Sequence, residues 1–241
     1  VAEPFDQILD NEPLRTLDFD VVADGAQYAA YVEARWLLHD RLTIDVGMRW
    51  DYQSYTTAND DTQSSPRISL LYDLADNTEL RLGWGQYSQA QEVNELQVSD
   101  GNDAFFPAQR AEHIVLNLKH YFPAGTNVDI SFFRKKFRAV RPRYENVLNQ
   151  LTIVPELQFD RVVIDADSAE SRGAELMVSR GSGGDELFWW LGYAWSRVED
   201  TRPQGKQKRS WDQTHTIKLG ASWRWSKWDF SMAGEVHTGW P

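Results

Sequence analysis

The stretch RLTIDVGMRWDY (residues 41–52) sorts its side chains by even and odd position. Successive side chains of a β-strand point to opposite faces of the sheet, so this alternation predicts a strand with two different faces. One face carries only apolar and aromatic side chains: Leu42, Ile44, Val46, Met48, Trp50 and Tyr52. The other face carries Thr43, Asp45, Gly47, Arg49 and Asp51. An apolar outer band with large aromatics near the strand ends, opposite a polar lumen, is the pattern of a membrane-spanning β-barrel.

The same alternation recurs along most of the chain. Further strands are expected near residues 28–38, 67–74, 78–88, 111–122, 126–137, 170–180, 186–197, 214–225 and 228–237. The chain therefore contains about ten expected strands, and their length is close to the roughly 9–11 residues that a tilted membrane-spanning strand needs. No apolar run approaches the roughly 20 residues of a membrane helix.

Short and long connections alternate between the expected strands. The short turns lie at residues 38–41, 75–78, 123–126, 181–185 and 226–227, and the long polar connections at 53–66, 89–110, 138–169 and 198–213. Outer-membrane barrels have tight periplasmic turns on one rim and long extracellular loops on the other. The connections thus favour a barrel wall, and they place residues 1–27 in the tail of an extracellular loop.

Composition excludes several other classes of protein. The chain has 36 acidic and 25 basic residues, which argues against a nucleic-acid-binding protein. Its apolar content includes 11 Trp, 11 Phe and 9 Tyr, residues that favour strands. It has no cysteine, which excludes a thiol nucleophile, a thiolate metal site and a disulfide framework.

The segment ELFWWLGYAWSRVED (residues 186–200) shows which solvent these strands face. Leu187, Trp189, Leu191, Tyr193 and Trp195 share one face, which we assign to lipid. Trp190 lies on the opposite face and should point into the lumen near the periplasmic rim. Aromatic residues concentrate where a bilayer meets water. The predicted membrane-facing girdle comprises Trp50, Trp189, Tyr193, Trp195, Trp223, Trp225 and Trp228.

The expected fold is all-β, an antiparallel transmembrane β-barrel segment of about ten strands with short periplasmic turns and long extracellular loops. Residues 1–241 form one partial barrel domain, with strands and loops from residue 28 onward. The alternative fold is a large soluble β-domain with amphipathic sheets.

Several segments in order resemble the barrel of TonB-dependent outer-membrane receptors. They are SPRISLLYDL (65–74), TELRLGWGQYSQAQEVNELQ (78–97), PAQRAEHIVLNLKHYF (107–122), SAESRGAELMVSR (168–180), RSWDQTHTIKLGASWRW (209–225) and HTGWP (237–241). The resemblance maps to the later part of the family's barrel. It does not extend to the plug domain, the short box that binds TonB, or the closing strands, so we expect a fragment of a larger receptor.

The resemblance implies TonB-energised uptake of a scarce nutrient, such as an iron–siderophore complex, in the outer membrane of a Gram-negative bacterium. The implied partners are outer-membrane lipid and lipopolysaccharide, a small-molecule ligand such as a metal chelate, and TonB through a plug region. A passive porin-like barrel and a soluble all-β interaction domain remain alternatives.

The candidate ligand-binding residues are Arg141, Arg143 and Tyr144, in the long connection 140–167. Guanidinium groups presented there could pair with carboxylate or phosphate groups of an anionic ligand. The alternative is a loop that contacts lipopolysaccharide or solvent only.

Catalytic and metal sites are not expected. The five histidines lack metal-ligand spacing, and there is no GxSxG motif around a serine nucleophile. We therefore expect no catalytic residue, no metal, no cofactor and no enzyme activity, although some outer-membrane barrels are proteases or phospholipases.

Overall fold

The computed structural model describes residues 25–55, 63–96, 104–146, 148, 161–181 and 185–239, and its fold is all-β. Within these ranges the elements are β1 (Gln27–His39), β2 (Leu42–Gln53), β3 (Gln63–Ala75), β4 (Thr78–Gln89), the 3-10 helix η1 (Val93–Glu95), β5 (Gln109–Tyr121), β6 (Thr126–Arg138), β7 (Arg143–Asn146), β8 (Arg161–Ile164), β9 (Ser168–Arg180), β10 (Leu187–Arg202), β11 (Gly205–Lys208), β12 (His215–Trp225) and β13 (Trp228–His237). Among the described residues, no helix is both long enough and apolar enough to cross a bilayer.

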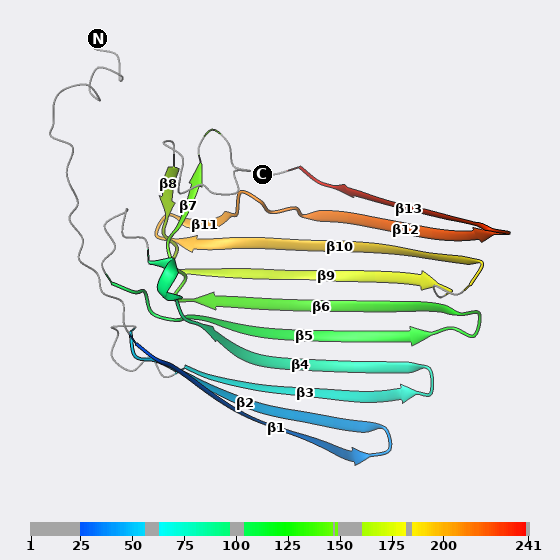
Figure 1. Ribbon diagram of the computed structural model, residues 1–241, viewed down its shortest axis with the longest axis horizontal. Helices are drawn as coiled ribbons and strands as arrows, with labels where there is room; N and C mark the ends of the chain where they lie inside the picture. The colour runs from blue at the N-terminus through cyan, green and yellow to red at the C-terminus, as the bar shows by residue number, and fades with distance from the viewer. Residues whose placement is uncertain are drawn as a thin grey trace, which may run out of the picture.

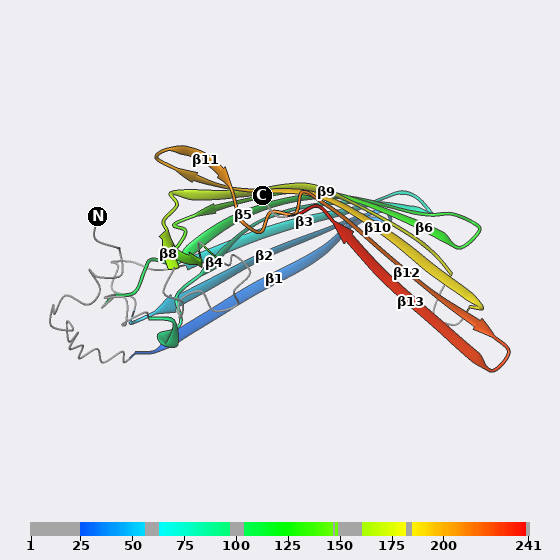
Figure 2. The same ribbon diagram turned by 90° about the horizontal axis from the view of Figure 1, so that it is seen from above.

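Ten of the strands form one curved antiparallel sheet in the order β1-β2-β3-β4-β5-β6-β9-β10-β12-β13 (Figures 1 and 2). The tight turns lie at one end of this sheet, and the longer connections gather at the other, which we call the loop end (Figure 1). The barrel-type fold expected from the alternation is confirmed. Of the expected extracellular tail, residues 1–24 lie outside the described part of the chain.

The long connections contain more paired backbone than the sequence pattern indicates. β7 and β8 form a separate hairpin within residues 138–169, and β11 pairs with the last four residues of β10. β3 begins at Gln63, inside the expected connection 53–66. These pairings carry polar residues on both faces, so no apolar and polar alternation marks them.

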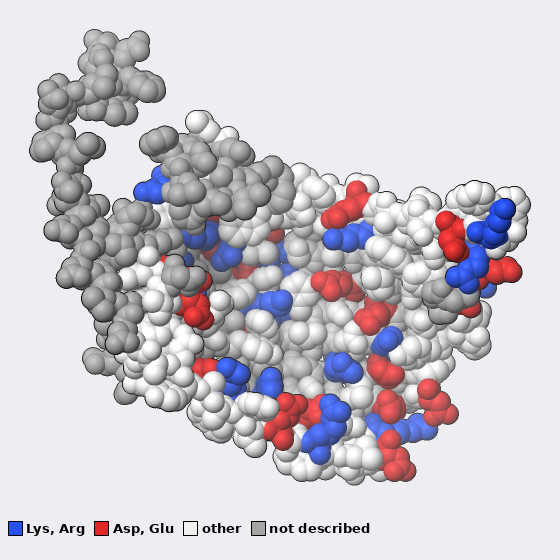
Figure 3. Space-filling view, viewed as in Figure 1, with Lys and Arg blue, Asp and Glu red and all other residues white. Residues whose placement is uncertain are grey.

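Strand register places different sets of side chains on the two faces of the sheet. On one face, Arg35 is paired with Asp45 and Asp45 with Ser69, and the Arg35 Nε lies 2.5 Å from Asp45 Oδ1. Lys, Arg, Asp and Glu side chains are spread over the middle of the sheet in Figure 3. We call the face that carries Asp45 the luminal face and the opposite face the outer face.

The outer face is apolar along a continuous cross-strand row. The row consists of Trp36, Ile44, Leu70, Leu82, Leu116, Phe132, Ala174 and Trp195, each paired with the next. The row crosses β1 at Trp36, three residues before that strand ends. It crosses β10 at Trp195, eight residues after that strand begins. Such a stagger is the register offset of strands that tilt in a barrel wall.

Two glycines allow large side chains or backbone to approach the luminal face. A Cβ at Gly220 would lie 2.5 Å from Nε1 of Trp190, so the indole packs directly over Gly220. A Cβ at Gly173 would collide with the Trp195 carbonyl oxygen and lie 2.7 Å from Cζ of Phe133. Trp190 therefore lies on the luminal face, as predicted, and packs against this sheet.

The Gly173→Ala substitution should lower the free energy of unfolding by about 1–3 kcal/mol, because the added methyl meets a backbone carbonyl that cannot rotate away. The measurement is denaturant unfolding of the protein expressed from its complete gene, in detergent micelles. Gly83→Ala is the matched control, since nothing lies within 4 Å of its added Cβ. Equal losses for both variants would contradict the steric explanation.

Candidate functional site

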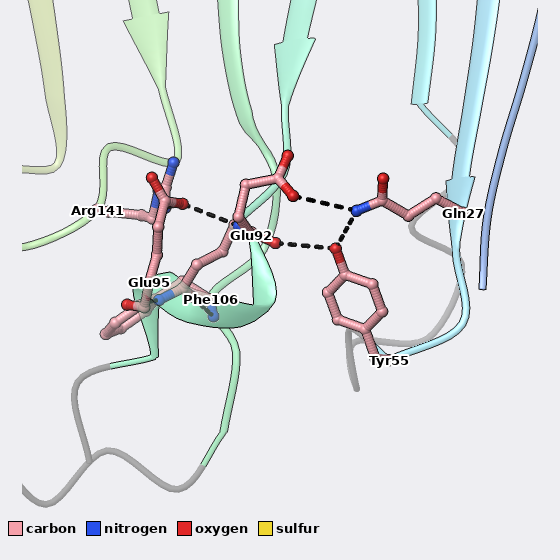
Figure 4. A network of polar contacts seen from close by, with 7 residues as sticks. Gln27, Tyr55, Glu92, Glu95, Phe106 and Arg141 are labelled. Atoms are coloured by element: carbon pink, nitrogen blue, oxygen red, sulfur yellow. Dashed lines mark hydrogen bonds and ion pairs between the residues drawn. The ribbon is translucent and has the colours of Figure 1, made fainter. Parts of the chain in front are cut away.

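Segments that are distant in sequence meet at the loop end of the sheet (Figure 4). Gln27, at the start of β1, donates from Nε2 to the Tyr55 hydroxyl and to Glu92 Oε2, the latter at 3.3 Å. The Tyr55 hydroxyl in turn donates to the main-chain carbonyl of Gln91 at 3.4 Å. The buried Tyr55 ring also packs edge-on against Phe105, with the ring centroids 5.1 Å apart. These contacts fix the connection after β4 against the first hairpin.

Helix η1 orients a carboxylate toward the connection that follows β6. Glu95 Oε2 accepts hydrogen bonds from the Glu92 backbone amide at 2.9 Å and from Arg141 Nη1 at 2.8 Å. Hydrogen bonding from Arg141, with a smaller effect of the Glu92 amide, lowers the pKa of Glu95 below its ordinary value of 4.5. Gln91 stabilises the same turn by donating to the Glu95 carbonyl at 2.8 Å and accepting from the Phe106 amide at 2.9 Å. Arg141 is thereby held in place at the loop end.

A second cluster surrounds the carboxylate of Asp200, which is 1% exposed on the luminal face of β10. Arg143 Nη2 lies 2.7 Å from Asp200 Oδ2, and Arg209 Nε lies 2.9 Å from Asp200 Oδ1. Arg143 also contacts Glu145 at 2.7 Å. Both guanidinium groups lie over the ring of Trp211, at 5.0 Å and 5.4 Å from its centroid. One buried carboxylate and one indole thus orient two arginines from separate loops.

The two clusters line a common cavity of about 470 Å³. Its walls include Gln91, Glu95, Phe106, Arg141, Arg143 and Arg209. Two guanidinium nitrogens in these walls, Arg141 Nε and Arg143 Nη1, are buried without a hydrogen-bond partner among the described residues. A buried donor without a partner is unfavourable, so the cavity is chemically suited to a ligand that brings oxygen acceptors.

The structure brings together two of the three predicted ligand-binding residues. Arg141 and Arg143 line the cavity, whereas Tyr144 is not among its lining residues. Tyr144 lies on β7 with the Arg161 guanidinium 5.3 Å from its ring centroid, because the hairpin pairs Tyr144 with Val163 beside Arg161. A ligand role for all three residues remains a prediction.

The residues of the predicted aromatic girdle all lie on the outer face. Trp225 and Trp228 flank the turn between β12 and β13 and are more than half exposed. Trp50 lies toward the loop end of β2. The Tyr193 hydroxyl is 2.8 Å from His215 Nδ1, and the remaining members are Trp189, Trp195 and Trp223. Contact of these rings with lipid stays a prediction.

Asp200, Arg209 and Trp211 were not predicted as site residues. The alternation of β10 places Asp200 on the luminal face, after Ala194, Ser196 and Val198, and this position is the signal that could have found it. In the ranges that the structure describes, no group of three or more His, Cys, Asp or Glu side chains is arranged to hold a metal ion.

Comparison with solved structures shows the same fold in known outer-membrane receptors. The ferripyoverdine receptor of Pseudomonas aeruginosa bound to ferripyoverdine matches with a TM-score of 0.57 and 17% identity, over 83% of this chain and 26% of that one. The alcaligin receptor FauA from Bordetella pertussis matches with 0.59 and 18%, over 88% and 37%. The siderophore receptor PirA from Acinetobacter baumannii matches with 0.64 and 13%, over 87% and 33%.

The chain thus spans between 26% and 37% of the length of these three receptors, and the low identities show a shared fold alone. No match was found among curated protein sequences. Residues 3–240 match the family described as "TonB dependent receptor-like, beta-barrel", and the chain therefore belongs to the β-barrel family of TonB-dependent receptors.

Proposed function

We propose that this chain forms part of the barrel wall and the ligand-receiving loops of an outer-membrane receptor for an oxygen-rich, anionic metal chelate such as an iron–siderophore complex, with uptake energised through TonB. The family consists of receptors and transporters found in the Gram-negative outer membrane, which confirms the expectation that the chain is not an enzyme. The cavity at the loop end is the observation that carries the proposed ligand class.

The chemistry of the cavity favours an oxygen-bearing ligand over an apolar one. Its three arginines are held by Glu95, Asp200 and Glu145, so the charges within the protein are already balanced. The buried Arg141 Nε and Arg143 Nη1 nevertheless keep unused donor capacity. Carboxylate, hydroxamate or catecholate oxygens would accept hydrogen bonds from these two nitrogens, and the arginines would keep their present ion pairs.

The structural neighbours add support of a different kind. They are described as receptors for ferripyoverdine, for alcaligin and for siderophores. Since this chain covers only part of such receptors, its own substrate, its use of TonB and its outer-membrane location are proposals. Outer-membrane lipid, including lipopolysaccharide, is the remaining proposed partner.

The Arg141→Gln substitution should lower the affinity for the transported chelate by about tenfold, because one charge-assisted hydrogen bond is lost. The measurement is binding and uptake of iron-loaded hydroxamate, catecholate and carboxylate siderophores by iron-starved cells carrying the complete gene. Arg41→Gln is the matched control, since Arg41 is half exposed and forms an ion pair with the exposed Asp76 at the opposite end of the sheet.

Two outcomes would contradict the proposal. Equal binding by wild-type protein and Arg141→Gln would show that the cavity does not take part in ligand recognition. Uptake that persists after deletion of TonB would indicate a passive barrel.

A further inference from the structure

The segment RSWDQTH (residues 209–215) joins β11 to the start of β12 and carries two residues of the loop-end site. Arg209 lines the cavity, and the ring of Trp211 lies under the guanidinium groups of Arg143 and Arg209. The next residue, Asp212, is only 2% exposed but is not among the residues that line the cavity. A buried carboxylate in this position has to be explained by the groups that it contacts.

The edge of β10 is interrupted where this segment passes it. β12 pairs with β10 as far as Trp195, and β11 pairs with β10 from Glu199 onward (Figure 1). Between these two points, residues 196–198 have no neighbour on this edge among the described strands. Backbone amide and carbonyl groups that lose water without gaining a partner are unfavourable. The connection 209–214 therefore has to supply the partners that a strand would otherwise offer.

Asp212 supplies one of these partners with its side chain. The Val198 amide donates to Asp212 Oδ1 at 2.7 Å, and the Val198 carbonyl accepts from the Arg209 amide at 3.1 Å. The Asp212 amide donates to the Arg209 carbonyl at 3.0 Å and closes a turn between the two residues. The carboxylate thus takes the place of a strand carbonyl. Three hydrogen bonds fix the turn at residues 209–212 to a single residue of β10.

The second carboxylate oxygen has weaker contacts. Asp212 Oδ2 accepts from the Thr214 hydroxyl at 3.1 Å and lies 3.5 Å from Lys208 Nζ. Lys208 is 39% exposed and lies farther away than a charge-assisted hydrogen bond requires. The acceptor oxygen that meets the Val198 amide is therefore the main contribution of Asp212, and the charge is secondary.

The turn at residues 209–212 lies beside the arginine cluster of the cavity. Val198 precedes Asp200 by two residues on β10, so Arg209 is held at its backbone by Val198 and at its guanidinium by Asp200, 2.9 Å away. Trp211 belongs to the same turn. A displacement of this turn would move Arg209 and the indole that supports Arg143 together.

We infer that Asp212 is a positioning residue for chelate binding, because its carboxylate fixes the turn that presents Arg209 and Trp211 at the loop-end cavity. This inference rests on the proposed function. It also distinguishes between two substitutions. An amide oxygen at position 212 can still accept from the Val198 amide, whereas a methyl group cannot.

The test measures binding of iron-loaded hydroxamate, catecholate and carboxylate siderophores, each titrated separately by calorimetry, to protein expressed from the complete gene and purified in detergent. Asp212→Ala should lower the affinity for the siderophore that wild-type protein binds by about tenfold. Asp212→Asn should stay within about twofold, because its amide group can donate to the Thr214 hydroxyl, which accepts as well as donates. An asparagine variant as weak as the alanine variant would overturn the inference.

A double-mutant cycle separates positioning from a general loss of structure. In the Arg209→Gln background, Asp212→Ala should lower the affinity by only about threefold, since Arg209 is already lost and the remaining effect passes through Trp211. A tenfold loss in both backgrounds would show that Asp212 does not act through Arg209, and it would overturn the inference.

Asn117→Ala is the matched control, since it removes another side-chain contact on the luminal face. Asn117 Nδ2 donates to Asp129 Oδ1 at 2.5 Å and to Ser131 Oγ at 2.8 Å. It lies eight residues along β5 from Gln109, which lines the cavity. Asn117→Ala should keep the wild-type affinity. An equal loss in Asn117→Ala and Asp212→Ala would contradict a specific role for Asp212.

Amide hydrogen exchange checks the turn without any siderophore. In peptides that contain Val198, protection should fall in Asp212→Ala and persist in Asp212→Asn. Unchanged protection in the alanine variant would overturn the inference. Wild-type protein that binds none of the siderophores would overturn the proposed function and, with it, the inference. Equal binding by wild-type protein and Asp212→Ala would overturn the inference alone.

Discussion

Asp200→Ala should lower the free energy of unfolding by about 3 kcal/mol and weaken binding of the chelate at the same time. Asp200 is almost fully buried between Arg143 and Arg209, so its removal leaves two guanidinium groups without their shared counter-charge. Arg143 would then lose the contact that positions it in the cavity. Denaturant unfolding and siderophore titration on the same preparation measure the two effects.

Comparison with two other variants identifies the cause. Asp200→Asn keeps the size of the side chain, but it removes the charge and replaces one of the two acceptor oxygens with an NH2 group. A loss close to that of alanine would therefore assign the effect to the two ion pairs and not to side-chain packing. Asp76→Ala breaks the pair with Arg41 at a carboxylate that is 96% exposed, and it should change stability very little. An Asp200→Ala variant as stable as Asp76→Ala would show that Asp200 does not hold Arg143 and Arg209 in place.

Leu191→Arg should destabilise the inserted barrel by about 2–4 kcal/mol and reduce the amount of protein assembled in the outer membrane. Leu191 lies on the outer face of β10, between Val178 of β9 and Leu219 of β12. An arginine there would have to leave water for the middle of the apolar band. Heat-modifiable migration on gels and the yield from purified outer membranes measure assembly.

The matched control places the same charge on the other side of the wall. Thr216 lies on the luminal face of β12, and the hollow that it lines also contains Asp129 and Glu175. Thr216→Arg should therefore assemble at nearly the wild-type level. Normal assembly of Leu191→Arg would show that this face does not meet lipid.

The main sheet could be predicted because its information is local. Each strand repeats an apolar and polar alternation that can be read without knowing its neighbours, as in the segment that contains Leu42 to Tyr52. The β7–β8 hairpin and the pairing of β11 with β10 could not be predicted in this way. In those segments both faces carry polar side chains, so Glu199 opposite Lys208 leaves no periodic signal.

The candidate site could be predicted only in part, because it depends on contacts between residues that are distant in the sequence. Arg141 and Arg143 were identified from charge in a long loop, but the groups that orient them are distant in the chain. Glu95 is 46 residues from Arg141, and Asp200 is 57 residues from Arg143. A single sequence carries no indication of such pairings. Adjacency in sequence does not place Tyr144 beside Arg143 in the cavity, because neighbouring strand residues point to opposite faces.

The order of strands in the sheet has a consequence for how the wall is assembled. Most strands pair with the strand that precedes them in the chain. The exceptions along the main sheet are β9, which pairs with β6 across the β7–β8 hairpin, and β12, which pairs with β10 across the short strand β11. Closing a short loop costs little chain entropy, so each new strand can zip onto an edge that is already present. The wall can therefore grow hairpin by hairpin in chain order. The slowest step should be the capture of β9, which requires closure of the longest loop between paired strands of the sheet.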